Sequence, residues 1–131
     1  MITTYNAKDC VITVNDTYIT GLGEDMVSGE KDEDNVSPAV GAQGDVVVNE
    51  VNNDLGTITL TVQGTSPQVG YLLDLCNTKE LFSIWVNNKS IGTKFGGTKA
   101  IMKKTPNLEH GAELSDIEFE IAVLDYTVTA A

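Results

Sequence analysis

TITLTVQGTSPQVGYLLDLCN, residues 57–77, carries a strand pattern followed directly by a helix pattern, and this pair decides the fold class. Ile58, Leu60 and Val62 alternate with the three threonines at 57, 59 and 61. A period of two places the apolar residues on one face of a strand and the threonines on the other. The sequence therefore predicts a strand over residues 57–62.

The residues that follow carry the signals of a helix start. Ser66 can cap the helix, and Pro67 stands where its missing N–H costs nothing. An apolar stripe with i, i+3, i+4, i+7 spacing is formed by Val69, Leu72, Leu73 and Cys76. Asn77 is suited to end the helix. The sequence predicts one α-helix over about residues 66–77.

Strand patterns lie on both sides of this pair. Residues 10–14 alternate, and Asn15-Asp16 offers turn chemistry before Tyr18 and Ile19, which predicts a hairpin. Gly21 and Gly23 interrupt the pattern, and a second extended run begins near Met26. Further strands are predicted over residues 82–86, 98–104 and 118–128.

The last of these runs changes phase. Its apolar set moves from Phe119, Ile121 and Val123 to Leu124, Tyr126 and Val128. A phase change inside a long strand predicts a bulge or a bend. Because there is no internal repeat and no domain boundary, we expect residues 1–131 to form a single, mainly β domain. A small β-sandwich or barrel with one flanking α-helix is the expected product.

Residues 35–56 do not fit this pattern. The segment contains Gly, Pro, Asn and the apolar run Val46-Val47-Val48. Loops beyond about 12 to 15 residues are uncommon in compact domains unless they are functional or disordered. We expect a long protruding loop that has room for a short strand or a hairpin arm.

Composition excludes several classes of function. The formal net charge is −11, and all eight basic residues are lysines, so the chain lacks the arginines and the positive charge of a nucleic-acid-binding module. No stretch approaches the roughly 20 apolar residues of a membrane helix. The N-terminus lacks a signal-peptide pattern. Cys10 and Cys76 fit a reducing cytosol and are predicted to be small buried hydrophobes.

The residues that could carry catalysis or hold a cofactor do not favour an enzyme. The single histidine, His110, lies in a Gly-flanked segment that predicts a solvated turn. GTKFGGTK, residues 92–99, lacks the spacing of a phosphate loop and instead favours a turn or a close approach between strands. Residues 32–34 are acidic, but an EF-hand counted from Asp32 would place Ser37 at position 6 and Gln43 at position 12. No metal site is predicted, although a looser calcium site stays open.

The same acidic stretch has a second pattern. If residues 26–34 are extended, Glu30, Asp32 and Asp34 share one face at intervals of about 6.6 Å. The opposite face, with Val27, Gly29 and Lys31, is the better candidate to turn inward. The row is either a plain solvated strand face or a charged wall.

Several segments together resemble the tail tube proteins of contractile-tailed phages, whose relatives occur in prophages and phage-tail-like bacteriocins. The segments are GEDMVSGEKDED, VGAQGDVV, NDLGTITLTVQGTSP, WVNNKS…KFGGTKA and EFEIAVLDYTV. The resemblance covers nearly the whole chain in order. It implies a β-sandwich or barrel with one flanking helix, assembled as homohexameric rings that stack into a hollow tube.

The resemblance also implies a setting and partners. The tube lies inside a contractile sheath in the virion, after synthesis in the bacterial cytoplasm, and DNA passes through it without specific binding; a bacteriocin tube punctures instead. The implied partners are other copies of the chain, the tail sheath protein, a baseplate or tube initiator and a tape-measure protein. No cofactor and no membrane segment are implied.

Candidate site residues follow from this setting. The resemblance implies that Glu30, Asp32 and Asp34 line the lumen, where they would repel DNA phosphates. It implies that the loop reaches the next ring through Val36, Ala39, Val40, Gln43, Asp45 and Val47.

Half of the lysines lie within eleven residues, 94–104. Lys99 and Lys103 share a strand face, whereas Lys104 is expected to point with Ala100 and Met102. The first two are expected either to meet acidic residues of the adjacent subunit or simply to favour solubility.

A carbohydrate- or calcium-binding β-sandwich module is the alternative function. It would need an exposed aromatic platform or a closed oxygen cage. Trp85 is the only tryptophan, and its position in a predicted strand favours burial in the core or in an interface.

Overall fold

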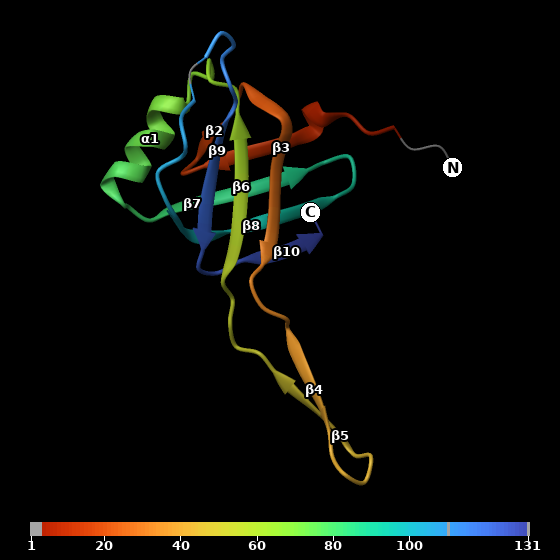
Figure 1. The fold of residues 1–131 in the computed structure, drawn as a ribbon. Helices are drawn as coiled ribbons and strands as arrows, with labels where there is room; N and C mark the ends of the chain where they lie inside the picture. Colours follow the sequence, from red (N-terminus) through yellow and green to blue (C-terminus); the bar gives the residue numbers. More distant parts are fainter. Residues whose placement is uncertain (1–3, 110, 131) are drawn as a thin grey trace.

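One curled sheet of eight strands forms most of the protein, and a two-stranded hairpin projects from it (Figure 1). The computed structural model describes residues 4–109 and 111–130. In these residues the elements are η1 (Ala7–Asp9), β1 (Cys10–Val14), β2 (Thr17–Tyr18), β3 (Leu22–Lys31), β4 (Val36–Val40), β5 (Val46–Glu50), β6 (Gly56–Val62), α1 (Val69–Thr78), β7 (Phe82–Asn88), β8 (Thr93–Met102), β9 (Ile117–Val123) and β10 (Thr127–Ala130). The mainly β class with one flanking helix is confirmed.

The sheet curls because β8 belongs to both of its halves. Strand order is β2-β1-β7-β8-β9-β6-β3, and β10 also pairs with β8. The first part of β8 pairs with β10 through Thr93 to Gly96, and its last part pairs with β9 through Ala100 to Met102. Gly96 permits the approach of β7 to β8, because a Cβ there would lie 2.0 Å from the carbonyl oxygen of Ile84.

The core lies between the two halves of the curled sheet. Alternate residues of the paired strands point into it, as the period-two patterns predict. The largest fully buried side chains are Phe119, Ile12, Ile58, Leu60, Leu72, Ile84 and Ile121. Among the described residues, no helix combines the length and the apolar character that crossing a bilayer requires.

The two local predictions at the N-terminus have different outcomes. The hairpin of β1 and β2 is confirmed, with Asn15 and Asp16 at positive φ values of 51° and 65° in the turn. The second run starts earlier than expected: β3 begins at Leu22, and its register against β6 shifts between Leu22 and Val27. Gly23 is therefore inside an irregular strand rather than before it.

The helix is confirmed, but Ser66 is not its cap. α1 begins at Val69 after Gln68, and the Ser66 hydroxyl instead donates to the carbonyl oxygen of Thr20 at 2.6 Å. The helix ends at Thr78, one residue beyond Asn77. The buried helical residues are Leu72, Leu75 and Cys76, so Leu75 replaces Leu73 in the deepest positions.

The phase change near the C-terminus marks a corner. β9 ends at Val123, the chain turns through residues 124–126, and β10 then pairs with the other end of β8. What was predicted as one bent strand over residues 118–128 is therefore two strands. The preceding strand also differs, since β8 includes the glycines at 96 and 97 and ends at Met102 instead of residue 104.

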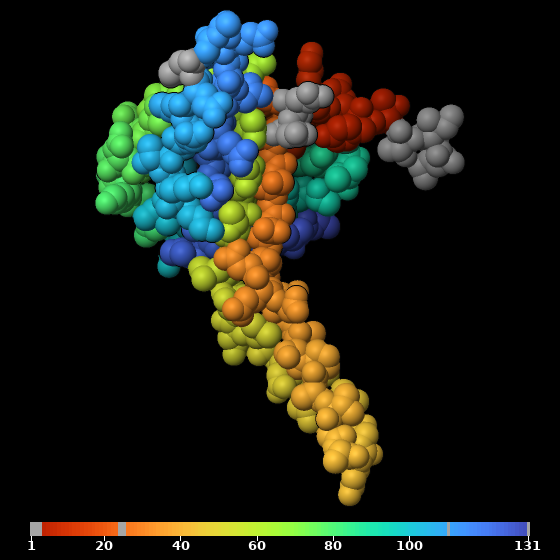
Figure 2. Space-filling view, viewed as in Figure 1, coloured from red at the N-terminus to blue at the C-terminus, as the bar shows by residue number. Residues whose placement is uncertain are grey.

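The long segment before β6 is a protruding hairpin. β4 and β5 pair antiparallel from Val36↔Glu50 to Val40↔Val46 as a separate sheet. All ten strand residues are exposed. Figures 1 and 2 show the hairpin pointing away from the body.

Candidate assembly surfaces

The outward sides of β3, β6 and β9 form one polar surface, which we call the glutamate face. Cross-strand pairs Glu30↔Thr57, Thr59↔Glu120 and Thr61↔Glu118 set its geometry. Its residues are Ser28, Glu30, Thr57, Thr59, Thr61, Glu118 and Glu120, all exposed or half-buried. The opposite sides of the same strands enter the core, so the threonine face predicted for residues 57–62 is the outward one.

The predicted row of three carboxylates is only partly present. Glu30 lies on the glutamate face, and Asp32 reaches the same place by accepting a hydrogen bond from the Thr57 hydroxyl at 3.0 Å. β3 ends at Lys31, however, and Asp34 lies beyond a bend on the way to β4. The prediction of a regular strand to residue 34 is wrong, because the partner strand β6 begins at Gly56, opposite Lys31, and the chain bends beyond that pair. At this point the Lys31 amine donates to Asn35 Oδ1 and lies 4.0 Å from Asp54 Oδ1.

Two further carboxylates take the place of Asp34. Glu118 and Glu120 come from β9, which pairs with β6 on the side opposite β3. Sequence reasoning missed them because the pairing of distant strands is not visible in a local pattern. Their alternation with Phe119 and Ile121 was the available signal.

The inward side of β3 agrees with prediction. Val27 packs against the core. Gly29 lies so close to Phe95 and Tyr126 that a Cβ would approach Phe95 Cε2 to 2.7 Å. Burial raises the pKa of Tyr126, and the nearby charge of Glu30 raises it further.

The hairpin has one apolar side. Pairing places Pro38 opposite Val48 and Val40 opposite Val46, so these side chains share a face. This valine face consists of Val36, Pro38, Val40, Val46 and Val48. The other side carries Ser37, Ala39, Val47 and Asn49, whereas Gln43 and Asp45 lie at the tip.

The six loop residues selected from sequence therefore do not form one surface. Val36 and Val40 belong to the valine face, but Ala39 and Val47 belong to its reverse. Pro38, Val46 and Val48 were missed. An apolar run such as residues 46–48 shows two faces only when the partner strand is known.

The lysine-rich segment lies at the end of β8. Lys99 and Lys103 are exposed, and the Lys103 backbone N–H donates to the carbonyl oxygen of Glu120 at 2.9 Å. Lys104 does not point with Ala100 and Met102, because those two are buried and β8 ends before it. Its amine instead lies 3.8 Å from the Glu120 carboxylate.

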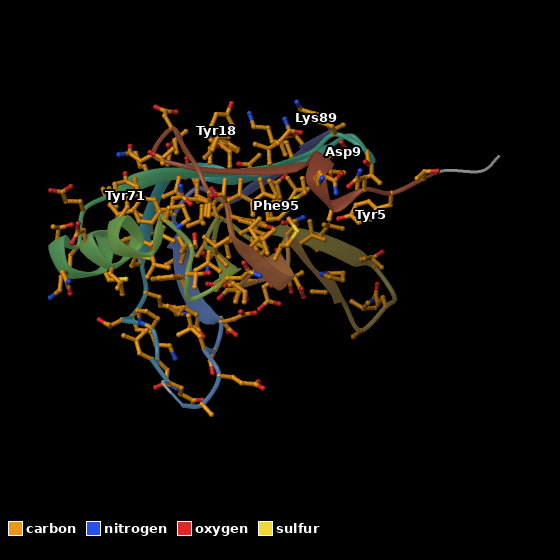
Figure 3. All side chains as sticks on the ribbon, turned by 90° about the horizontal axis from the view of Figure 1, so that it is seen from above. Tyr5, Asp9, Tyr18, Tyr71, Lys89 and Phe95 are labelled. Atoms are coloured by element: carbon orange, nitrogen blue, oxygen red, sulfur yellow. The ribbon has the colours of Figure 1, made fainter. Side chains whose placement is uncertain are left out.

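Trp85 lies on the outward side of β7 rather than in the core. Its ring is half-buried, and the Lys94 amine lies 4.4 Å from the ring centroid. Figure 3 shows Tyr18 and Lys89 on the same outward side of the sheet, and Phe95 on its inward side. Trp85 and the exposed Tyr18 line a hollow together with Lys89 and Lys94.

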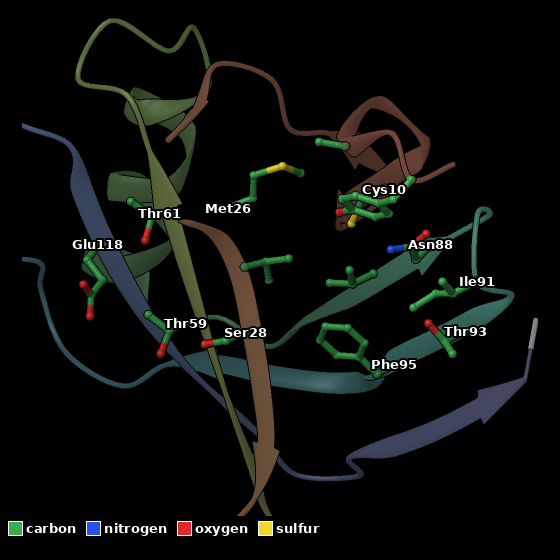
Figure 4. A pocket seen from close by; sticks show the side chains of 14 residues that line it. Cys10, Met26, Ser28, Thr59, Thr61, Asn88, Ile91, Thr93, Phe95 and Glu118 are labelled. Carbon is green, nitrogen blue, oxygen red and sulfur yellow. The ribbon is translucent and has the colours of Figure 1, made fainter. Parts of the chain in front are cut away.

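A groove of about 710 Å³ opens between β3 and the β7–β8 pair (Figure 4). Part of its lining is apolar, with Cys10, Val27, Val86 and Phe95, and Tyr5 and Ile91 are exposed. The rest is polar and includes residues shared with the glutamate face, namely Ser28, Thr59, Thr61 and Glu118. Burial raises the pKa of the Cys10 thiol. Cys10 is thus half-buried in a groove, whereas Cys76 is buried in the core as expected.

The described residues contain no group of three or more His, Cys, Asp or Glu side chains arranged to hold a metal ion. The acidic residues 32–34 line a shallow hollow with Ser37 and Val51. His110 lies outside the described residues, so its predicted turn is not assessed.

The architecture defines a curled β-sheet domain with one flanking helix and one long hairpin arm. The model of the family described as bacteriophage PhiTE tail tube protein matches residues 10–125. The chain belongs to this family of phage tail tube proteins, which are structural components of phage-like particles. The resemblance seen in the sequence is confirmed.

Solved structures of contractile particles share the fold. A chain from the extracellular contractile injection system PVC sheath/tube terminator, extended state, is 15% identical with a TM-score of 0.72, covering 98% of this chain and 99% of its own. A chain from the anti-feeding prophage tube-terminating cap is 12% identical with a TM-score of 0.71, and the match covers 100% of this chain and 94% of its own. A chain from the PVC sheath-tube complex is 15% identical with a TM-score of 0.68, covering 98% and 93%. A search of curated proteins found no match.

Proposed function

We propose that the chain forms, as a single tail-tube domain, hexameric rings that stack into the inner tube of a contractile tail. The tube is a conduit for DNA in a phage, or a puncturing tube in a bacteriocin. The family match over residues 10–125 carries this proposal. Unpaired edges of β3 and β10 in the described sheet support it, since such edges are suited to pairing with a neighbouring subunit.

The glutamate face lines the lumen in this proposal. Glu30, Glu118 and Glu120 project from it among threonines, with Asp32 beside Thr57. Negative groups repel DNA phosphates only within about 8 Å at physiological salt, which is the range that a lining requires. Asp34 is nearer the hairpin base and takes a smaller part in the lining.

The hairpin joins successive rings. An isolated two-stranded hairpin is marginal in water, and this one exposes its whole length. Val36 and Val40 contribute through the valine face, Ala39 and Val47 through its reverse, and Gln43 and Asp45 at the tip. Burial against the next ring supplies the stabilisation that the hairpin lacks in a free subunit.

Lys99 and Lys103 set the orientation of neighbouring subunits within a ring. Both side chains are exposed on an acidic protein, so they attract carboxylates of the adjacent copy. Such contacts give specificity and association rate more than affinity. The tail sheath surrounds the tube, a baseplate initiator starts it and a tape-measure protein occupies it during assembly.

Electron microscopy of the purified protein at rising concentration tests this function. We expect rings and then stacked tubes. A variant in which residues 36–50 are replaced by a short glycine linker should fold and form single rings without stacking. A wild-type protein that stays monomeric at high concentration contradicts the proposal.

A further inference from the structure

We propose that the valine face of one copy docks into the Cys10–Phe95 groove of a second copy. This inference rests on the proposed stacking function and adds the surface that receives the hairpin. It joins two described surfaces that each lack cover within their own chain.

The hairpin supplies an apolar ligand surface. Val40, Val46 and Val48 are 70%, 62% and 61% exposed, and they lie together on one side of the β4–β5 pair. Contiguous exposed apolar side chains indicate a contact surface when they share one face. Along the paired residues, the side that carries the valine face has no charged residue until the base of the hairpin, where Glu50 pairs with Val36.

The groove supplies a receptor surface whose apolar part can receive the valine face. Phe95, Met26 and Ile91 point into it from β8, β3 and the β7–β8 loop (Figure 4). Its mouth is held by η1, because the Ser90 hydroxyl donates to the Asp9 carboxylate at 2.6 Å and the Lys89 N–H donates to the Asp9 carbonyl oxygen at 3.1 Å. A groove braced in this way is formed before a partner arrives.

Position excludes the hairpin of the same chain as the occupant. The hairpin leaves the body where β3 ends, whereas η1 and the start of β3 lie at the other end of the body (Figure 1). A protruding surface at one end and a complementary groove toward the other form a head-to-tail contact. Repeated between copies, such a contact produces stacking and not a closed dimer.

Charge favours the same pairing. Each copy carries a formal charge of −11, so two copies repel over most of their surfaces. Among the described residues that line the groove, Glu118 alone is charged, so contact with the valine face adds little repulsion while removing apolar surface from water.

The test uses the native Cys10 thiol as a reporter of the groove. Its alkylation by a small maleimide is followed in free subunits and in tubes, and we expect assembly to slow it by at least about tenfold. Cys76, which is 8% exposed, is the internal control and should react slowly in both states. Equal reactivity of Cys10 in the two states overturns the proposal.

Cross-linking then identifies the occupant. In tubes of Val48→Cys, a mild oxidant such as copper–phenanthroline should join the new cysteine to Cys10 of another copy in a disulfide, because the two thiols would lie side by side. Mass spectrometry of the linked peptides identifies the pair. Val47→Cys, on the reverse of the hairpin, is the matched control and should give at least about tenfold less of that link. Val46→Cys replaces Val48→Cys if the latter does not assemble.

The outcomes separate this inference from the proposed function. Tubes whose hairpin cysteine links to a different region, or whose Val47→Cys and Val48→Cys variants link equally to Cys10, overturn the docking site and leave the tube function standing. Wild-type protein that never assembles overturns both.

Discussion

Asp125 accepts two hydrogen bonds from Thr98, one from the backbone N–H at 3.1 Å and one from the hydroxyl at 2.5 Å. Its other oxygen accepts from the Lys99 N–H at 3.0 Å. These N–H groups lie between the part of β8 that pairs with β10 and the part that pairs with β9. Asp125 therefore replaces a strand partner at the corner of the sheet.

Asp125 gives a prediction about acid stability. Desolvation raises its pKa, but the hydrogen bonds from Thr98 and Lys99 outweigh this and lower the pKa below its ordinary value. The stability that Asp125 gives the folded protein is therefore fully present above the unfolded pKa of about 3.9, and it is lost as pH falls through the folded pKa. Asp125→Asn should lower the free energy of unfolding by about 1 to 2 kcal/mol at pH 7. This loss is smaller than at a buried site, because the hydrogen bonds of Asp125 are partly exposed to solvent. Urea unfolding at neutral and acid pH measures both effects. Equal acid sensitivity in the variant and the wild type would show that Asp125 is not responsible.

Gly56 gives a prediction about packing. A Cβ at this position would lie 2.3 Å from Tyr126 Cγ, so Gly56→Ala must displace the ring that closes this end of the core. We expect a loss of about 1 to 3 kcal/mol in unfolding free energy. Gly70→Ala in α1 is the control, because nothing lies within 4 Å of its Cβ position and alanine favours a helix by up to about 1 kcal/mol. A stable Gly56→Ala variant would contradict the described contact.

The hairpin should change its dynamics on assembly. Residues 36–48 lack tertiary cover in the described subunit, so their amides should exchange rapidly in the free protein and become protected in tubes. β6, whose inward residues are buried, serves as the control and should be protected in both states. Equal protection of the hairpin before and after assembly would mean that stacking does not use it.

The lysines at the end of β8 should matter for ring formation. The double variant Lys99→Glu with Lys103→Glu is expected to impair ring assembly at low salt, because exposed attraction becomes repulsion. Lys8→Glu with Lys89→Glu makes the same change in net charge elsewhere and controls for it. Normal rings from the first variant, measured by sedimentation, would reduce Lys99 and Lys103 to a role in solubility.

Reversing charge on the glutamate face should affect transport more than assembly. Replacing Glu30 and Glu120 with lysine is expected to leave tubes intact but to slow or block DNA delivery in an infectious phage, because lysines hold phosphates. Lysines in place of the exposed Glu80 and Glu113 make the matched control, with the same change in net charge. Normal delivery by the first variant would argue against a role for these carboxylates in the lumen.

Prediction from sequence succeeded where a pattern is local. The alternation over residues 57–62, the Asn15-Asp16 turn and the helical stripe each correspond to an element in the structure. The helix start was misplaced because the Ser66 hydroxyl bonds to Thr20, a residue 46 positions away in the chain. The row of carboxylates was extended too far because β3 ends where its partner β6 begins, at the pair Lys31↔Gly56.

The sequence predicted the candidate surfaces less well than it predicted the fold. Glu118 and Glu120 join Glu30 only through the β6–β9 pairing, and the valine face exists only through the β4–β5 register. Both depend on which strands pair, and a one-residue change of register would send every side chain to the other face.

A map of the assembled tube at side-chain resolution would show where the glutamate face and the hairpin lie. We expect hexameric rings in which Glu30, Glu118 and Glu120 point into the lumen and each hairpin crosses to the next ring. A tube in which the glutamate face points outward, or in which each hairpin folds back on its own ring, would contradict it.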